Sequence, residues 1–190
     1  AEGKYYINTS VSVLDGSVEN VYYKYTVVSD EVREDIVSDF MTADESGVIQ
    51  VIDEEILVQG KAYRMTCVSM GNPHAVVFME EDVKTLDIEA IGPKFENHER
   101  FPKRTNTEFM RVLDRNTMDM RVWERGSGET FACGTGTCAA VVAAVLNGYT
   151  ERNVLVHLLG GDLEILWDEK DNHVYMTGSA TTVFDGEIEI

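Results

Sequence analysis

Residues 137–146 constrain the fold more than any other part of this 190-residue chain, because they have a helical pattern and carry no charge on any side. A helix that lies on a protein surface needs a polar face, so a helix that is uncharged all round must be enclosed by other elements. Asn147 and Gly148 follow directly and are typical of a left-handed helix end. The sequence therefore predicts a central helix surrounded by the rest of the chain.

Strands are predicted to provide that enclosure. Several stretches are rich in β-branched and aromatic residues or alternate apolar with polar positions, which is the pattern of strands. They are residues 5–14, 21–29, 63–69, 75–79, 107–113, 118–123, 154–158, 163–167 and 173–176. Other helical patterns are weaker: residues 31–40 are polar, and residues 88–95 are interrupted by Gly92 and Pro93. The expected fold class is α+β, with a mainly antiparallel sheet wrapped around a central buried helix.

Composition excludes several classes of partner. The net charge of -18 gives a field that repels nucleic acid and anionic lipid. No segment approaches the roughly 18 consecutive apolar residues of a membrane span, and the first residues do not resemble a secretory leader. Three cysteines and four histidines supply neither a disulfide framework nor a zinc site. We therefore expect a soluble cytoplasmic protein with reduced thiols that binds no nucleic acid, membrane or metal.

A glycine-rich loop, residues 124–138, leads into the central helix and contains Cys133. A helix start offers unpaired backbone N–H groups and the positive end of the helix dipole, so it can hold a carboxylate and favour a thiolate. Glycines at 134 and 136 let the backbone approach a ligand closely. Most free cysteines are small buried hydrophobes. In this loop, however, Cys133 is better interpreted as a nucleophile or a proton-transferring group.

The other two cysteines are predicted to be packing residues. Cys138 lies five positions after Cys133, which at ~100° per residue turns it about 140° away around the helix axis. Cys67 shares the face of Tyr63 and Met65 on a predicted strand. Neither is therefore expected to share a site with Cys133.

Polar side chains at strand ends are further candidates. Glu124 and Arg125 end a predicted strand beside the cysteine loop, and they suit an ammonium group and a carboxylate respectively. Asn72 lies in a turn between two strands, where its amide can donate to a carboxylate and accept from an ammonium group. Asn106 starts a strand and can do the same. His74 is a minor candidate, because a histidine in such a turn is more often half-buried than catalytic.

These residues lie in motifs that resemble the diaminopimelate epimerase family, which interconverts LL- and meso-diaminopimelate without a cofactor on the route to lysine. The similar stretches occur in the family's order from about residue 60 to the end of the chain. They are VSMGNPHAVVF (68–78), RTNTEF (104–109), VWERGSGET (122–130) and ACGTGT (132–137), followed by GDLEI (161–165) and VYMTGSA (174–180).

The resemblance implies a role for each candidate. The family uses two cysteines on opposite faces of the substrate's α-carbon, and Cys133 is one of them. Gly134 and Thr135 are implied to bind the reacting α-carboxylate through backbone N–H groups, and Glu124 to bind the α-ammonium. The residues implied to hold the distal amino acid end of diaminopimelate are Asn72, Asn106 and Arg125. The family forms two similar domains with the site between them, needs no cofactor, and is usually a homodimer.

One family motif is missing from these residues. The second cysteine of the family lies in a motif of the form Asn-Gly-x-Arg-Cys, and no such motif occurs here. The expectation is thus a truncated chain with half of the active site, which alone is inactive or nearly so and forms a homodimer or a self-associated fragment. Residues 1–47 are expected to be a remnant of the N-terminal domain, 48–178 the C-terminal domain, and 179–190 a closing strand that returns to the N-terminal domain.

Two alternatives remain open. One is a non-catalytic ligand-binding or interaction module derived from the family. The other is a related cofactor-independent racemase of another amino acid. The combination of Glu124 and Arg125 with two asparagines argues against the small monocarboxylate substrate of such a racemase and favours a substrate with two amino acid ends.

Overall fold

In the computed structural model of the chain, one sheet curls around a central helix. The structure describes residues 51–179 in full. For residues 6–12 and 20–28 it describes only the backbone strands and their pairing. The helices are the 3-10 turn η1 (Val83–Thr85), α1 (Ile88–Glu96) and α2 (Gly134–Leu146). The strands are β1 (Tyr6–Ser12), β2 (Asn20–Val28), β3 (Glu54–Val58), β4 (Lys61–Ser69), β5 (Pro73–Phe78), β6 (Asn106–Asp114), β7 (Thr117–Glu124), β8 (Gly128–Thr130), β9 (Asn153–Leu158), β10 (Gly161–Trp167) and β11 (His173–Ser179).

The sheet order brings distant parts of the sequence to one edge. It runs β1-β2-β11-β10-β9-β7-β6-β5-β4-β3, with β8 paired to β7. Most pairs are antiparallel, whereas β5 with β6 and β7 with β9 are parallel. His74 therefore lies opposite Asn106 at the starts of β5 and β6, and Thr107 lies opposite Trp123 near the end of β7. The starts of β5 and β6 and the end of β7 consequently meet at the same edge.

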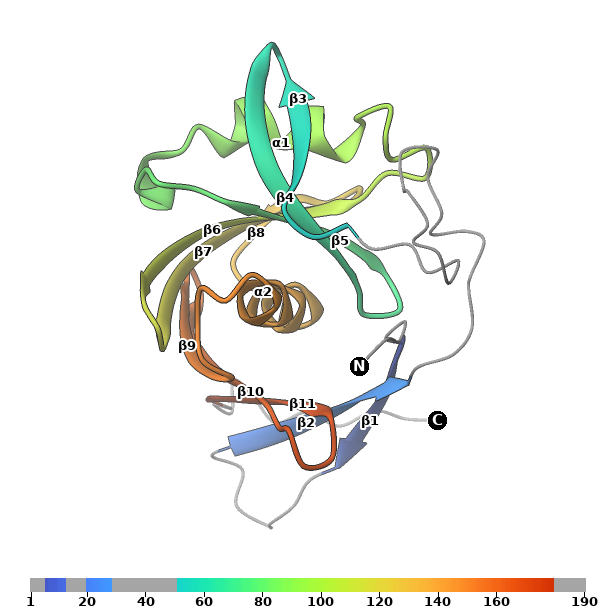
Figure 1. Cartoon of the computed structure of the whole chain (residues 1–190), viewed down its shortest axis with the longest axis vertical. Coiled ribbons are helices and arrows are strands. Elements are labelled where there is room, and N and C mark those ends of the chain that lie inside the picture. The colour runs from blue at the N-terminus through green and yellow to red at the C-terminus, as the bar shows by residue number, and fades with distance from the viewer. Residues whose placement is uncertain (1–5, 13–19, 29–50, 180–190) are drawn as a thin grey trace, which may run out of the picture.

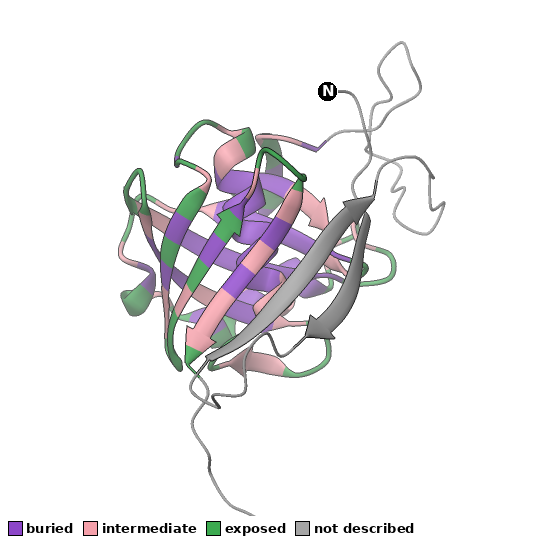
Figure 2. Cartoon of the chain, turned by 90° about the horizontal axis from the view of Figure 1, so that it is seen from below, coloured by how far each residue is buried: buried purple, intermediate pink, exposed green. Residues whose placement is uncertain are grey.

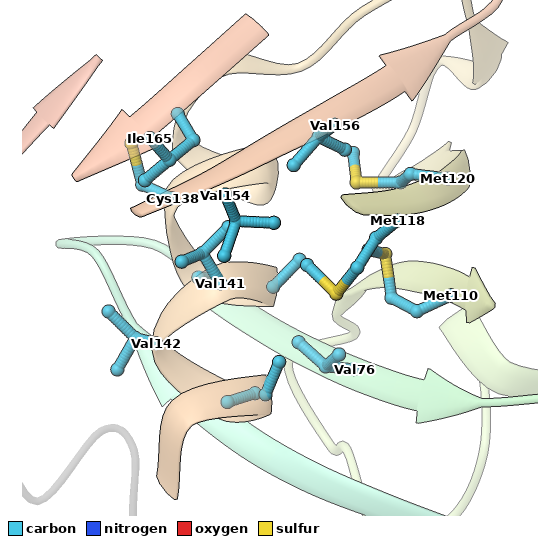
Figure 3. Packing of buried hydrophobic residues seen from close by; sticks show 14 of the residues in the cluster. Val76, Met110, Met118, Met120, Cys138, Val141, Val142, Val154, Val156 and Ile165 are labelled. Carbon is cyan, nitrogen blue, oxygen red and sulfur yellow. The ribbon is translucent and has the colours of Figure 1, made fainter. Parts of the chain in front are cut away.

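Alternate residues of the strands face two different helices. On β6, Met110 faces inward into the cluster around α2, while Phe109 faces outward into a second cluster with Phe95 of α1. We call these the inner and the outer cluster. Figure 1 shows α2 enclosed by the curled sheet and α1 outside it, and Figure 2 shows that the buried residues lie mainly within the strands while the turns are mostly exposed. The inner cluster includes Val76, Met110, Met118, Met120, Cys138, Val141, Val154, Val156 and Ile165 (Figure 3).

Both features of the predicted fold class, α+β with a sheet around a central buried helix, are confirmed. Residues 137–144 of α2 are buried, and every predicted strand is present where the structure describes it, with small shifts of the strand ends between residues 51 and 179. The helix itself begins at Gly134, three residues before the predicted start. Two short strands, β3 and β8, were not predicted.

The interrupted pattern at residues 88–95 forms a continuous helix, α1, with Pro93 inside it. Asp87 caps its first turn by accepting a hydrogen bond from Ala90 N at 3.2 Å. Gly92 is required by packing, since a Cβ there would lie 2.3 Å from Cδ2 of Trp123. The glycine that weakens the helical pattern is thus what lets α1 approach the sheet.

Some predictions fall outside the described residues, namely the helix at 31–40 and the closing strand at 179–190 except for Ser179. The proposed boundary after residue 47 also lies there. Strands β1 and β2 continue the main sheet through the pairing of β2 with β11. Of the helices in the described ranges, none is long and apolar enough to cross a membrane.

Candidate active site

The N-terminus of α2 points at the sheet edge where β5 and β6 begin and β7 ends. Strand alternation puts polar residues of that edge on the inner face: His74 shares its face with Val76, Glu108 with Met110, and Glu124 with Val122. Val76, Met110 and Val122 all belong to the inner cluster. The apolar interior around α2 therefore ends in a polar layer at the helix start.

Cys133 is the first residue of this helix end. It occupies the N-cap position with φ -135° and ψ 107°, and its side chain makes no capping hydrogen bond. Its side chain is largely buried at 8% exposure, and its Sγ lies 3.6 Å from Oγ1 of Thr135. The first helical hydrogen bond runs from Thr137 N to Cys133 O at 2.8 Å. The N–H groups of Gly134, Thr135 and Gly136 precede that bond, so they are the donors that a helix start offers to an anion.

The helix start acts on the Cys133 thiol in the expected direction, but burial has the larger effect. Burial raises the pKa of the Cys133 thiol to about 11, while the nearby N–H of Gly136 and the hydroxyl of Thr135 lower it and the carboxylates of Glu108 and Glu124 raise it. Desolvation of the charged form thus outweighs the helix end. At neutral pH Cys133 is a thiol, so in this state it is suited to donating a proton.

A chain of hydrogen bonds connects the deep interior to the helix start. His74 Nδ1 lies 2.6 Å from Oε1 of Glu108, and His74 Nε2 lies 3.0 Å from Oδ1 of Asn72. Asn72 Nδ2 in turn donates to Oγ1 of Thr135 at 3.3 Å. Through Thr135 the chain reaches the sulfur of Cys133. Asn72 and Thr135 are therefore brought together at the cysteine, as parts of one network.

Asn106 and Arg125 form a second group on the same edge. Asn106 Oδ1 accepts from the backbone N of Arg125 at 2.8 Å, and Asn106 Nδ2 donates to Pro73 O at 3.1 Å. Asn106 therefore ties the turn after β7 to the turn that carries Asn72. The guanidinium of Arg125 is exposed and donates to Lys103 O at 3.2 Å. A role for either residue in binding substrate stays a prediction.

Glu96 at the end of α1 fixes the turn that presents Arg125. Its carboxylate accepts from Trp123 Nε1 at 2.7 Å, from Arg104 Nη1 at 2.9 Å and from Gly126 N at 2.9 Å. Gly126 has φ 84°, a conformation that favours glycine. The outer helix thus positions the loop on one side of the candidate site.

Glu124 lies at the end of β7, half-buried, between the two groups. Its Oε1 accepts from Oγ1 of Thr130 at 2.6 Å, and Thr130 Oγ1 is also 3.4 Å from Ala132 O. The carboxylate is therefore tied to the backbone immediately before Cys133. Its predicted role with the substrate ammonium is untested by this geometry.

Sequence reasoning missed two acidic residues of this region, Glu108 and Glu96. Glu108 carried a signal, because it is a carboxylate in phase with the apolar residues Met110 and Val112 of the same strand. His74, ranked as a minor and half-buried candidate, is in fact 1% exposed. Cys138 and Cys67 were predicted correctly as packing residues, since Cys138 is in the inner cluster and Cys67 packs against the outer one. In the part of the chain that the structure describes, no three His, Cys, Asp or Glu side chains are grouped so as to hold a metal ion.

Curated proteins that are similar in sequence to this chain are named diaminopimelate epimerase. A family model described as diaminopimelate epimerase matches residues 66–183. A diaminopimelate epimerase of Methanococcus maripaludis is 53% identical over 180 residues, which is 95% of this chain and 64% of the relative. One of Agathobacter rectalis is 62% identical over 141 residues, 74% of this chain and 49% of the relative. The chain therefore spans less than two thirds of the length of these curated relatives.

Solved structures support the fold. A hydroxyproline epimerase from Agrobacterium vitis superposes with a TM-score of 0.55 over 91% of this chain and 53% of its own, at 14% identity. A probable proline racemase from Agrobacterium radiobacter gives 0.52 over 97% and 57%, at 13% identity. At such low identity these two show the architecture alone. The match of the family model over most of the chain, together with the motifs gathered at the start of α2, shows that this chain belongs to the diaminopimelate epimerase family.

Proposed function

We propose that the chain supplies one catalytic face of a diaminopimelate epimerase that acts in lysine biosynthesis. The observation that carries the proposal is the position of Cys133 at the uncapped start of α2, next to Thr135 and Asn72. In this proposal the backbone N–H groups of Gly134 and Thr135 hold the reacting α-carboxylate. Glu124 binds the α-ammonium, and Asn72, Asn106 and Arg125 hold the distal end.

The chemistry follows from the weak acidity of the α-hydrogen. When a base on the far face removes that proton, negative charge develops on the α-carbon and its carboxylate, and preorganised N–H donors stabilise it. The thiol of Cys133 then gives its proton to the α-carbon from the near face, which inverts the centre and leaves Cys133 as a thiolate. Its raised pKa and low exposure suit the donor role, because a dry thiol keeps its proton until a carbanion takes it.

Epimerisation by this scheme requires a second acid/base group. Cys138 is buried in the inner cluster and Cys67 is partly buried against the outer one, and burial raises the pKa of both thiols. The second group is therefore proposed to come from outside these residues, as the family's second cysteine. The 190-residue chain alone is expected to be inactive or nearly so.

A fusion tests this proposal. The chain is placed after the N-terminal part of the Methanococcus maripaludis relative, and conversion of LL- to meso-diaminopimelate is followed by chromatography. The fusion should epimerise, Cys133→Ala should abolish turnover, and Cys138→Ala should retain it as the matched control. Normal turnover by the Cys133→Ala fusion would overturn the catalytic assignment, and robust epimerisation by the 190-residue chain alone would overturn the half-site.

Calorimetry combined with a measurement of α-proton exchange separates the enzyme from a non-catalytic module. Both predict that diaminopimelate binds, but only the enzyme predicts exchange of the α-proton with solvent by the fusion. Binding without exchange would favour the module. Tighter binding or faster turnover of proline or hydroxyproline than of diaminopimelate would favour the related racemases.

We further propose a cytoplasmic location and a homodimeric or self-associated state. Exposed apolar side chains support self-association: Phe131 is 76% exposed and Leu159 51%, and Gly160 N bonds to Phe131 O at 2.8 Å. Sedimentation velocity of the chain should therefore give a species larger than a monomer. A monomer at high concentration would contradict this part of the proposal.

A further inference from the structure

We propose that Glu108 is a positioning residue that acts through His74 to set the orientation of the Asn72 amide, so that this corner of the site presents N–H donors and selects a carboxylate. The assignment of the ligand group rests on the proposed function, because it names which group of an amino acid substrate meets Asn72. The orientation itself rests on contacts within the chain.

The first step concerns burial. The side chains of Glu108 and His74 are both 0% exposed, and no described residue partners Oε2 of Glu108. A buried carboxyl group is costly unless it is hydrogen-bonded, and among the described residues His74 is the partner of Glu108, with Nδ1 2.6 Å from Oε1. The bond to Glu108 therefore fixes the orientation of the His74 ring.

The second step concerns hydrogen-bond polarity. With Nδ1 of His74 held on Glu108, Nε2 is the ring atom that faces Asn72, and it lies 3.0 Å from Oδ1. An amide oxygen can only accept, so Nε2 is the donor of this bond. The amide then directs Nδ2 toward Thr135 at 3.3 Å.

The third step concerns the ligand. By itself an asparagine amide can serve a carboxylate or an ammonium equally well. Here its oxygen is used inside the protein, and its NH₂ group faces the start of α2. Only one of the two N–H groups is needed for Thr135, so the other is a donor for substrate. This N–H group makes the Asn72 corner selective for the carboxylate, and not the ammonium, of the distal end of the substrate.

Packing couples the pair to the helix. A Cβ added at Gly136 would lie 2.6 Å from Glu108 Oε1 and 3.2 Å from Cys133 Sγ. The carboxyl group therefore sits directly against the first turn of α2. The buried acid and the substrate-facing amide are thus held in one fixed arrangement.

Nuclear magnetic resonance of the 190-residue chain tests the orientation directly. The ring ¹⁵N signals of His74 should show a proton on Nε2, and the side-chain NH₂ of Asn72 should give a nuclear Overhauser effect to the methyl group of Thr135. An unprotonated Nε2, or no contact between that NH₂ group and Thr135, would overturn the proposal without any variant.

Variants test the consequence for binding. Glu108→Gln can pair with His74 Nδ1 as donor or acceptor, so it should mix the His74 tautomers and weaken diaminopimelate binding by about tenfold. Asn72→Asp keeps the bond to His74 but presents an oxygen, and should weaken binding more. Asp119→Asn is the control, because Asp119 is also buried with an unpartnered oxygen but faces outward. It should leave the His74 signals and the affinity unchanged.

The positioning role of Glu108 and the proposed substrate can fail independently, and different results would show each failure. Unchanged affinity and an unchanged Nε2 proton in Glu108→Gln would overturn the positioning role. If the unmodified chain or the fusion does not bind diaminopimelate at all, the proposed substrate is wrong, while the ring and amide signals still decide the orientation of Asn72.

Discussion

Helices α1 and α2 pack on opposite faces of the same sheet and differ in their N-termini. α1 lies outside, has an exposed side and is capped by Asp87. α2 is enclosed, is uncharged along its length, and starts at Cys133 without a side-chain cap. The capped end has an acceptor side chain on its first turn, whereas the uncapped end is surrounded by polar side chains from β5, β6 and β7. The comparison suggests that the missing cap of α2 is kept free for an anionic ligand.

The largest contrast is expected from one added charge. Ala140 of α2 is fully buried, whereas Ala90 of α1 is exposed near the positive end of its helix. Ala140→Asp should cost more than about 4 kcal/mol and prevent folding, because it buries an unpaired charge. Ala90→Asp should change the free energy of unfolding by less than about 0.5 kcal/mol. Urea unfolding measures both, and a folded Ala140→Asp protein would contradict the enclosure of α2.

A methyl group at two glycines sharpens the contrast between structure and site. At Gly92 the added Cβ meets the Trp123 ring at 2.3 Å, and at Gly136 it meets a carboxylate oxygen at 2.6 Å. Gly92→Ala should cost about 1–3 kcal/mol by overpacking and leave the His74 signals unchanged. Gly136→Ala should shift those signals and weaken diaminopimelate binding, because Glu108 must move. The reverse pattern would show that α1, and not α2, is coupled to the network.

High pH tests the buried thiol, which only α2 carries at its start. In the unfolded chain the thiol ionises near its ordinary pKa of 9.0, and in the folded chain at about 11. Below pH 9 the stabilisation is fully present, and it is lost as the pH rises from 9 to 11. At about pH 10 the loss from Cys133 is ~1.4 kcal/mol. Urea unfolding of the chain and of Cys133→Ala at pH 8 and pH 10 measures the difference, and an equal pH response in both would refute the raised pKa.

The smallest effects are expected at the caps themselves. Asp87→Ala removes the cap of α1 and should cost about 1 kcal/mol. Cys133→Ser puts a good capping residue where the backbone is already extended. It should leave the free energy of unfolding unchanged or raise it by up to about 1 kcal/mol, while abolishing turnover in the fusion. Thermal unfolding of the two variants compares them. A large loss of stability in Cys133→Ser would mean that the thiol is needed for packing.

Sequence patterns predicted α2 well because the absence of charge is a global constraint. Its first three residues, Gly134, Thr135 and Gly136, were missed, since glycine and threonine are weak helix formers and only tertiary contacts make them helical. Strand β3 was missed because Glu54 and Glu55 are exposed, with Ile56 and Val58 alone facing the core. A two-residue turn holds it to β4, with positive φ at Gln59 and Gly60.

The cysteine and the residue types around it were predictable from the glycine-rich loop, but their protonation and connections were not. The pKa of Cys133 depends on how deeply the loop is buried, which no local pattern specifies. The link from Glu108 through His74 to Asn72 depends on the parallel pairing of β5 with β6, which joins residues 34 positions apart. The sequence therefore indicates which groups take part, and the topology decides what each one contacts.

The most direct measurement is a titration of the ¹⁵N-labelled chain with diaminopimelate, following the backbone amides of both helix starts. The amides of Gly134, Thr135 and Gly136 should shift with saturation as the carboxylate binds, while those of Ile88, Glu89 and Ala90 should not move. If the α2 amides stay in place, or if both helix starts respond alike, the uncapped end of α2 is not the carboxylate site.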